Sequence, residues 1–336
     1  MLVQKTMILP SPLRNRSVQN GKHKWPEVLN TVMIIGLFSA KEIGEKKLEQ
    51  IISKKLDSVN NMQIALTRSG DIIVYPLDYP NSISTFLRVL SISESVIFVL
   101  NQEVSALDAE IALAIEFSAL QKGYVLTDDY SDTQSFDALF SKYKLGKLPK
   151  IRELAEIDHR SDSQSQAGVS TVSIDKHFIV KGIGQVVLGF VLDGTVKKGD
   201  KMYLLPSGKQ VIVKSIQVMD EDKNSCGKGE HVGLALNNVD DKDFDVNYSV
   251  SSSNEVKSEF ACVFTKTDFY KLDPFASSVL TCAINGRNFG LNLKKENEKT
   301  LVSFSKPILK SQGSIVVADT SLAVGKNRIV GALSID

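Results

Sequence analysis

Residues 177–205 read HFIVKGIGQVVLGFVLDGTVKKGDKMYLL, and glycines interrupt the apolar runs of this stretch at positions 182, 184, 189, 194 and 199. Glycine is favoured where the backbone takes a positive φ or where two backbones approach closely. Short runs of Val, Leu and Phe between such glycines are typical of strands that turn sharply. The stretch therefore predicts a small β-barrel in the middle of the chain.

The composition is that of an ordinary globular protein. Of the 336 residues, 43% are hydrophobic and 24% are charged, which suffices for two or three domains with their own cores. We see neither a secretory signal nor an apolar run of the roughly 18 residues that span a bilayer. We therefore expect a cytoplasmic protein without a membrane partner. The net charge of +1 gives no support to a dedicated nucleic-acid binder, and we expect no DNA partner.

The residues that usually build metal sites and catalytic centres are scattered. Cys226, Cys262 and Cys282 show no CxxC spacing, so we expect reduced thiols and no zinc site. The four histidines do not have metal-ligand spacing, and no nucleophile motif accompanies them. The sequence therefore predicts no metal site and no catalytic residues.

Changes in pattern divide the chain into five segments. Residues 1–27 form a basic tail, for which we consider either disorder or contact with RNA phosphates. In residues 28–156, apolar runs alternate with amphipathic stretches, which predicts a doubly wound, Rossmann-like (P-loop-type) α/β domain. Residues 157–170 are a polar linker, and residues 171–253 and 258–336 each predict a small β-barrel, the second one trimmed.

Within the α/β segment we predict two long helices. Residues 42–59 carry Leu48, Ile51 and Val59 on one helical face. Residues 105–123 are expected to start at a capping box of Ser105 and Asp108 and to stop at Gly123.

The ordered series SIDKHFIVKGIGQVVLG, GTVKKGD, VKSIQVMDED and GKGEHVGLALNNVDDKDF, within residues 173–244, resembles the second domain of a known family. The family is that of translational GTPases of the elongation factor Tu, one-alpha and selenocysteine-specific type, here of the archaeal kind. Residues 305–308 (SKPI) resemble a turn of the family's last barrel, and residues 328–331 (RIVG) resemble its closing strand. The resemblance implies a GTPase-like first domain followed by two barrels.

The GTP motifs that the resemblance implies are degenerate. A phosphate-binding loop needs GxxxxGK[ST] between a strand and a helix. Placed on Gly36, the pattern puts Lys41 at the second glycine, Glu42 at the lysine and Ile43 at the hydroxyl. An acid in place of this lysine exchanges attraction for repulsion, and each such pair is worth roughly 4 kcal/mol at 4 Å. Alternatively, Ser39 and Glu42 form a capping box for the following helix.

Two further motifs have also lost residues. Asp78 keeps the position that would hold magnesium, while Asn81 replaces the glycine that senses the γ-phosphate. Alternatively, residues 78–81 form an ordinary turn after the strand. Residues 126–129 (LTDD) stand where NKxD would read guanine. We therefore expect neither GTP nor magnesium as a cofactor, and no GTP hydrolysis.

The resemblance also implies a pocket in the middle barrel for the aminoacylated end of tRNA. By position, Asp175 and Phe178 match acidic and aromatic wall residues, and His231 matches an asparagine. Lys176 and Leu188 depart from the acidic and hydroxyl residues of the family. The alternatives are that Phe178 belongs to the core and that His231 is a hydrogen-bonded barrel residue.

These observations leave three functions open. The first is an elongation-factor-like pseudo-GTPase that binds tRNA or a ribosome-associated component through its barrels, with its domains in a fixed arrangement. The second is a protein–protein interaction scaffold that binds no RNA. The third is a divergent elongation factor that still binds GTP. The sequence makes no prediction of the oligomeric state.

Overall fold

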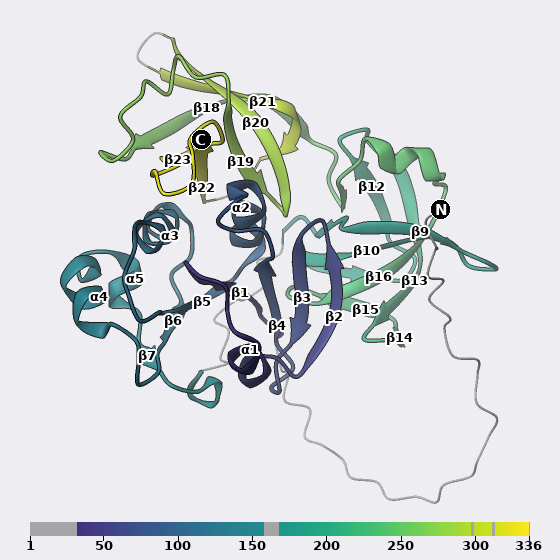
Figure 1. Cartoon of the computed structure of the whole chain (residues 1–336). Coiled ribbons are helices and arrows are strands. Elements are labelled where there is room, and N and C mark those ends of the chain that lie inside the picture. Colours follow the sequence, from purple (N-terminus) through teal and green to yellow (C-terminus); the bar gives the residue numbers. More distant parts are fainter. Residues whose placement is uncertain (1–31, 158–167, 297–298, 311–312, 336) are drawn as a thin grey trace, which may run out of the picture. The chain divides into compact units, whose positions relative to one another are not determined.

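The computed structural model of the chain describes residues 32–157, 168–296, 299–310 and 313–335. It contains an α/β domain followed by two β-barrels, as the sequence predicts (Figure 1). The basic tail of residues 1–27 and most of the 157–170 linker lie outside the described residues.

The α/β domain is built on a seven-stranded sheet with the order β2-β3-β4-β1-β5-β6-β7. Neighbours from β4 to β7 run parallel, whereas β2 and β3 are antiparallel additions at one edge. The strands are β1 (Ile34–Phe38), β2 (Lys54–Val59), β3 (Met62–Leu66), β4 (Ile72–Pro76), β5 (Ser95–Val99), β6 (Gly123–Leu126) and β7 (Lys150–Ile151).

Helices cover both faces of this sheet, as a doubly wound fold requires. The helices are α1 (Glu45–Ile51), α2 (Ile83–Ile92), α3 (Ala106–Phe117), α4 (Thr133–Phe140) and α5 (Lys144–Lys147), with a 3-10 turn at Leu154–Glu156. Phe86 of α2 and Ile111 of α3 pack into the core on one face. Ile51 of α1 packs with Ile35 on the other face.

The predicted helices are too long. The helix predicted over residues 42–59 is wrong in its second half, because α1 ends at Ile51 and Lys54–Val59 forms β2. Asn60 and Asn61, both at positive φ, turn β2 into β3. Gly123 does not stop a helix: it begins β6, where a Cβ would lie 2.4 Å from Val96. The capping box is confirmed, since the Ser105 side chain accepts from the backbone N–H of Asp108 and the Asp108 carboxylate accepts from the backbone N–H of Ser105.

The middle barrel is a closed ring of six strands in the order β12-β17-β8-β10-β16-β13. Its strands are β8 (Thr171–Ser173), β10 (Gly184–Asp193), β12 (Lys201–Leu205), β13 (Lys209–Val218), β16 (His231–Asn237) and β17 (Ser249–Ser251). Four short strands are added, namely β9 (Lys176–Val180) on β10, β14 (Glu221–Lys223) on β13, and the pair β11 (Thr195–Lys197) and β15 (Ser225–Gly227).

The last barrel is also a closed ring of six strands, in the order β18-β21-β20-β19-β22-β23. The strands are β18 (Val256–Lys266), β19 (Leu280–Ile284), β20 (Arg287–Glu296), β21 (Lys299–Leu309), β22 (Ser314–Asp319) and β23 (Ile329–Ile335). The start predicted at residue 258 is two residues late. Residues 305–308 lie within β21, at a bulge between its pairings with Glu259 and Lys257, and do not form the predicted turn.

The α/β domain and the last barrel share one continuous core. Ala283, Val316 and Ile329 of the barrel belong to the same buried cluster as Phe86 and Ile111. A buried ion pair crosses the same contact: Arg328 Nη2 lies 2.6 Å from Glu110 Oε1, and the two side chains are 3% and 1% exposed. A large apolar contact of this kind opposes relative motion of the two parts.

The middle barrel approaches the α/β domain through a tight turn at Gly229. This residue has φ +90°, and a Cβ added to it would lie 1.9 Å from the carbonyl oxygen of Val32. Glycine is therefore needed here for space as well as for backbone conformation.

We predict that Gly229→Ala destabilises the protein far more than Gly199→Ala does. Gly199 has nearly the same backbone angle, φ +91°, but a Cβ there would meet nothing within 4 Å. The control therefore measures the cost of the positive φ alone, about 1–2 kcal/mol. Urea unfolding of both variants checks this, and equal midpoints would contradict the close approach.

We predict that Glu110→Gln lowers the free energy of unfolding by about 3–5 kcal/mol, because it leaves Arg328 as a buried charge without its counterion. The control is Glu103→Gln, which removes an exposed ion pair with Lys41 and is expected to cost less than about 1 kcal/mol. Thermal and urea unfolding provide the comparison. A loss at Glu110 no larger than that at Glu103 would contradict the assigned role of the ion pair.

Candidate functional site

The loops that correspond to the GTP motifs meet at one edge of the sheet. Residues 39–44 follow β1, residues 78–81 follow β4 and residues 127–129 follow β6. Because these strands are parallel, their carboxyl ends lie at the same edge, which is where doubly wound folds bind ligands.

The structure corrects the position of the phosphate-binding loop. Gly36 lies inside β1, where a Cβ would stand 2.4 Å from Ser93 Oγ, so packing explains this glycine. Glu42 lies in the loop and does not cap a helix, since α1 begins at Glu45 with Gly44 as its N-cap. The predicted Ser39–Glu42 capping box is therefore wrong. The hydroxyl of Ser39 instead accepts a hydrogen bond from the Asn101 amide at 3.1 Å.

The loop between β1 and α1 has the six-residue length of GxxxxG, shifted by three residues from the predicted register. In this register Ser39 takes the place of the first glycine and Gly44 keeps the second. Glu45 stands at the lysine position, and Lys46 stands at the position of the hydroxyl that binds magnesium. Lys41 and Ile43 become spacer residues of the loop. If the loop is compared with a phosphate-binding loop in this register, the acid at the lysine position is Glu45 rather than Glu42.

The turn at residues 78–81 is attached to other parts of the chain. Asp78 Oδ2 accepts hydrogen bonds from Asn61 at 2.9 Å and from Thr85 at 3.0 Å. Asn81 is exposed. The Tyr79 hydroxyl donates to Glu110, and Arg328 donates to the carbonyl of Pro80 at 2.7 Å. The turn is therefore held by the same ion pair that joins α3 to the last barrel.

Charges and hydrogen bonds reinforce this attachment. Burial alone would lower the pKa of Arg328, but the hydrogen bond and the negative charge of Glu110 outweigh burial and raise the pKa. Burial, with the charge of Glu110, raises the pKa of Tyr79, so the phenol stays neutral and keeps its proton as a donor.

The two acids of the loop after β6 form ion pairs with other residues of the chain. Asp128 accepts a hydrogen bond from Lys47 of α1 at 2.7 Å, which with further hydrogen bonds lowers the pKa of Asp128. Asp129, the predicted match to the terminal residue of NKxD, lies 2.6 Å from Arg152. Both carboxylates therefore already have cationic partners.

The middle barrel brings two of the predicted pocket residues together. His231 Nε2 lies 3.6 Å from Asp175 Oδ2, with side chains that are 12% and 3% exposed. The ring of His231 packs at a tilt on Phe190. Within the part of the chain that the structure describes, both of these polar atoms are buried without a hydrogen-bond partner. The alternative of a hydrogen-bonded barrel histidine therefore does not hold for Nε2.

The other three predicted residues lie on or beside β9. Phe178 is 37% exposed and is not a core residue. Lys176 lies 3.0 Å from Asp57 of β2, so it joins the middle barrel to the α/β domain. Leu188 of β10 is the register partner of Lys176. The structure thus places all five residues in one region of the barrel and brings Asp175 and His231 into direct proximity.

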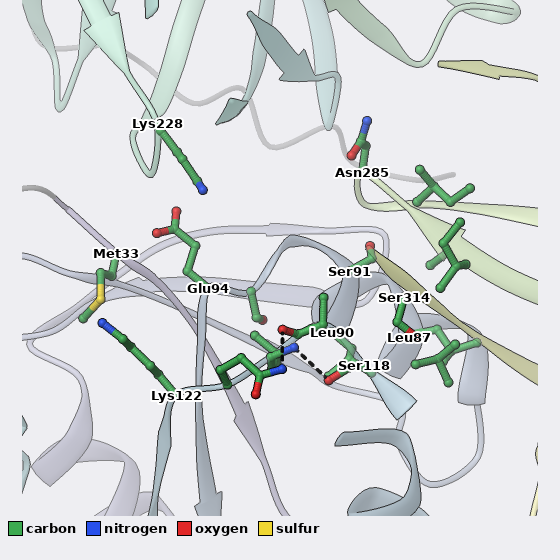
Figure 2. A pocket seen from close by; sticks show the side chains of 18 residues that line it. Met33, Leu87, Leu90, Ser91, Glu94, Ser118, Lys122, Lys228, Asn285 and Ser314 are labelled. Carbon is green, nitrogen blue, oxygen red and sulfur yellow. Dashed lines mark hydrogen bonds between the residues drawn. The ribbon is translucent and has the colours of Figure 1, made fainter. Parts of the chain in front are cut away.

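A cavity that the sequence did not indicate lies at the opposite edge of the sheet. It has a volume of about 390 Å³ and is lined by residues before β1, β5 and β6, from the ends of α2 and α3, and from both barrels (Figure 2). In Figure 2, Lys228 of the middle barrel and Glu94 extend toward one another across it. Burial raises the pKa of Glu94, while the charge of Lys228 partly offsets this.

Other side chains give no further candidate. Cys226, Cys262 and Cys282 are all buried. Among the described residues, no three His, Cys, Asp or Glu side chains are grouped so that they could hold a metal ion. In the same part of the chain, no helix has the length and apolarity to cross a bilayer.

Comparison with known proteins relates the chain to translation factors. Residues 184–247 match the family model of elongation factor Tu domain 2. An uncharacterized protein of Methanocaldococcus jannaschii is 25% identical over 178 residues, which are 51% of this chain and 57% of that protein. The selenocysteine-specific elongation factor of the same organism is 42% identical over 98 residues, 29% of this chain and 20% of the factor. The chain thus spans well under two thirds of the length of these relatives.

Solved structures show the same fold over most of the chain. The elongation factor SelB of Methanococcus maripaludis, in complex with the GTP analogue GppNHp, superimposes with a TM-score of 0.69 at 14% identity, covering 90% of this chain and 78% of that one. A bacterial selenocysteine-specific elongation factor gives a TM-score of 0.66 at 14% identity, covering 90% and 58%. With the domain 2 sequence in the middle barrel and this three-domain fold around it, the chain is a relative of the translational GTPase superfamily.

Proposed function

We propose that this chain is an elongation-factor-like protein that neither binds nor hydrolyses GTP and that binds tRNA or another translation component through its barrels. The first half of the proposal rests on Glu45. This exposed acid is the first residue of α1 and stands where a phosphate-binding loop has its lysine. The N-terminus of a helix attracts anions through its free N–H groups. Glu45 occupies the place where such an anion would bind and supplies the negative charge itself.

Two further features support the loss of a nucleotide switch. Ser39 replaces the glycine that would let the backbone approach a phosphate, and Lys46 replaces the hydroxyl that would ligate magnesium. The turn at residues 78–81, which would have to respond to a γ-phosphate, is held by Arg328 and Glu110. A ligand shifts a conformational equilibrium only by its differential affinity for the two states.

Support for the second half comes from the middle barrel. Residues 184–247 match elongation factor Tu domain 2, and the family resemblance implies a pocket for the end of a tRNA at Asp175, Phe178 and His231, of which Asp175 and His231 lie 3.6 Å apart. Phe178 offers an exposed ring to a nucleic acid base, and such rings are typical stacking platforms. The proposal places this protein in the cytoplasm.

We predict that the purified chain shows no saturable binding of a fluorescent GTP analogue at low micromolar concentration, with or without magnesium. Glu45→Lys should raise any residual affinity, because it exchanges repulsion for attraction at the phosphates. Glu42→Lys is the matched control: it makes the same charge change three residues away, within the loop. Equilibrium dialysis measures both.

Saturable binding by the unchanged protein would contradict the proposal and favour a divergent GTP-binding factor. A larger gain at Glu42 than at Glu45 would overturn the loop register.

We predict that the chain binds tRNA with an affinity that falls steeply as salt concentration rises, as counterion release requires. Phe178→Ala should weaken binding by about tenfold, the cost of one lost base stack. Ile179→Ala is the control, because Ile179 is 66% exposed on the same strand and, as the next residue, points to the opposite face. Fluorescence anisotropy with charged and uncharged tRNA provides the measurement. Failure of both tRNA forms at low salt would favour the protein–protein scaffold.

A further inference from the structure

We propose that the middle barrel recognises the end of a tRNA without its amino acid, because side chains of the protein itself fill the pocket that the family resemblance implies for the aminoacyl group. The inference rests on the proposed function and describes its partner more closely, as a tRNA whose aminoacylation does not strengthen binding. It is carried by the burial of Asp175 and His231 and by the exposure of Phe178.

The two polar residues of the implied pocket are packed inside the barrel. The side chain of Asp175 is 3% exposed and that of His231 is 12% exposed. Asp175 Oδ2 and His231 Nε2, the two atoms that face one another, are both buried. A hydrogen bond needs an approach to about 3 Å, so a ligand atom reaches neither of them while their neighbours keep their positions.

Phe190 of β10 fixes both of these residues. Its ring is fully buried, and the ring centroid lies 4.7 Å from that of His231. The backbone N–H of Phe190 donates at 2.9 Å to the hydroxyl of Ser173, which donates at 3.2 Å to Asp175 Oδ1. Phe190 also belongs to the core cluster that the α/β domain shares with the last barrel. Because interiors are close-packed, an added amino acid would have to displace side chains that this core holds.

The α/β domain covers the same region of the barrel. Lys176, which follows Asp175, places its Nζ 3.0 and 3.2 Å from the two carboxylate oxygens of Asp57 on β2. Arg88 of α2 is 7% exposed. Burial lowers the pKa of Arg88, and the negative charge of Asp175 partly offsets this effect. In its protonated form, the α-amino group of an aminoacyl ester would therefore compete with Arg88 for Asp175.

Phe178 remains available for the nucleotide itself. It lies on β9, three residues after Asp175, and is 37% exposed. A base that stacks on an exposed aromatic ring is held through its own π-face, whatever group its ribose carries. The end of the tRNA is therefore read by its base and not by its amino acid.

Fluorescence anisotropy on the full chain compares uncharged tRNA with the same tRNA carrying alanine through a non-hydrolysable amide link. We expect the charged form to bind no more than about threefold more tightly than the uncharged form, because the amino acid finds no new contacts. A charged form that binds more tightly than this would overturn the inference and leave the proposed function standing. Binding of neither form at low salt would overturn the proposed function, and this inference with it.

A variant that opens the pocket provides a second measurement. His231→Ala removes the ring that fills the space beside Asp175, so charged tRNA should gain at least about threefold relative to uncharged tRNA. His177→Ala is the matched control, because this histidine of the same barrel stacks on Phe244, with ring centroids 4.6 Å apart, and should leave the ratio unchanged. A general loss of stability lowers both affinities and does not move their ratio. Equal ratios in the two variants would overturn the role of His231 in closing the pocket.

Discussion

The contact between the α/β domain and the last barrel depends on the buried ion pair between Arg328 and Glu110. Both charges are almost fully removed from water, so each is tolerable only while the other is in place. The pair lies within an apolar contact that already joins α2 and α3 to the barrel. Because Arg328 also binds the carbonyl of Pro80, and Glu110 binds Tyr79, the turn at residues 78–81 shares this constraint.

This constraint and the proposed loss of GTP binding point in the same direction. A nucleotide switch needs a ligand that distinguishes two states and a segment that is free to take both. The loop between β1 and α1 offers an acid in place of a cation, and the turn after β4 is tied to a buried charge pair. Either change alone would weaken a switch, and under the proposed function the two together would remove both of its requirements.

The sequence predicted the fold well where the pattern was local. Glycines between apolar runs identified the middle barrel, and buried parallel strands such as Ile72–Pro76 were found as continuous apolar runs. The prediction failed at β2, which precedes a turn of two asparagines. Asparagine accepts a positive φ more readily than most residues, so residues 60–61 carried a turn signal that could have indicated this strand. Leu56 and Val59 of β2 happen to continue the helical spacing of the apolar residues of α1, so one long helix was predicted.

The candidate site was predictable only in part, for a physical reason. Gly36 was mistaken for a phosphate-binding glycine because a glycine required for packing against Ser93 looks the same in a sequence as one required for a ligand. Asp175 and His231 were named from the family resemblance of the middle barrel, and the structure places them 3.6 Å apart. The cavity could not be found in this way, since Glu94, Lys228 and Ile284 come from three domains and meet only in the folded chain.

The two edges of the α/β sheet therefore have different chemistry. At the carboxyl edge, Glu45 is exposed at the start of α1, and Asp128 and Asp129 form ion pairs with Lys47 and Arg152. At the amino edge, two lysines and an apolar wall surround unfilled volume, and the turns at Gly229 and Gly286 bring both barrels against the α/β domain. A group at the amino edge would touch all three domains, whereas the loops after β1, β4 and β6 reach the last barrel only through the turn that Arg328 holds.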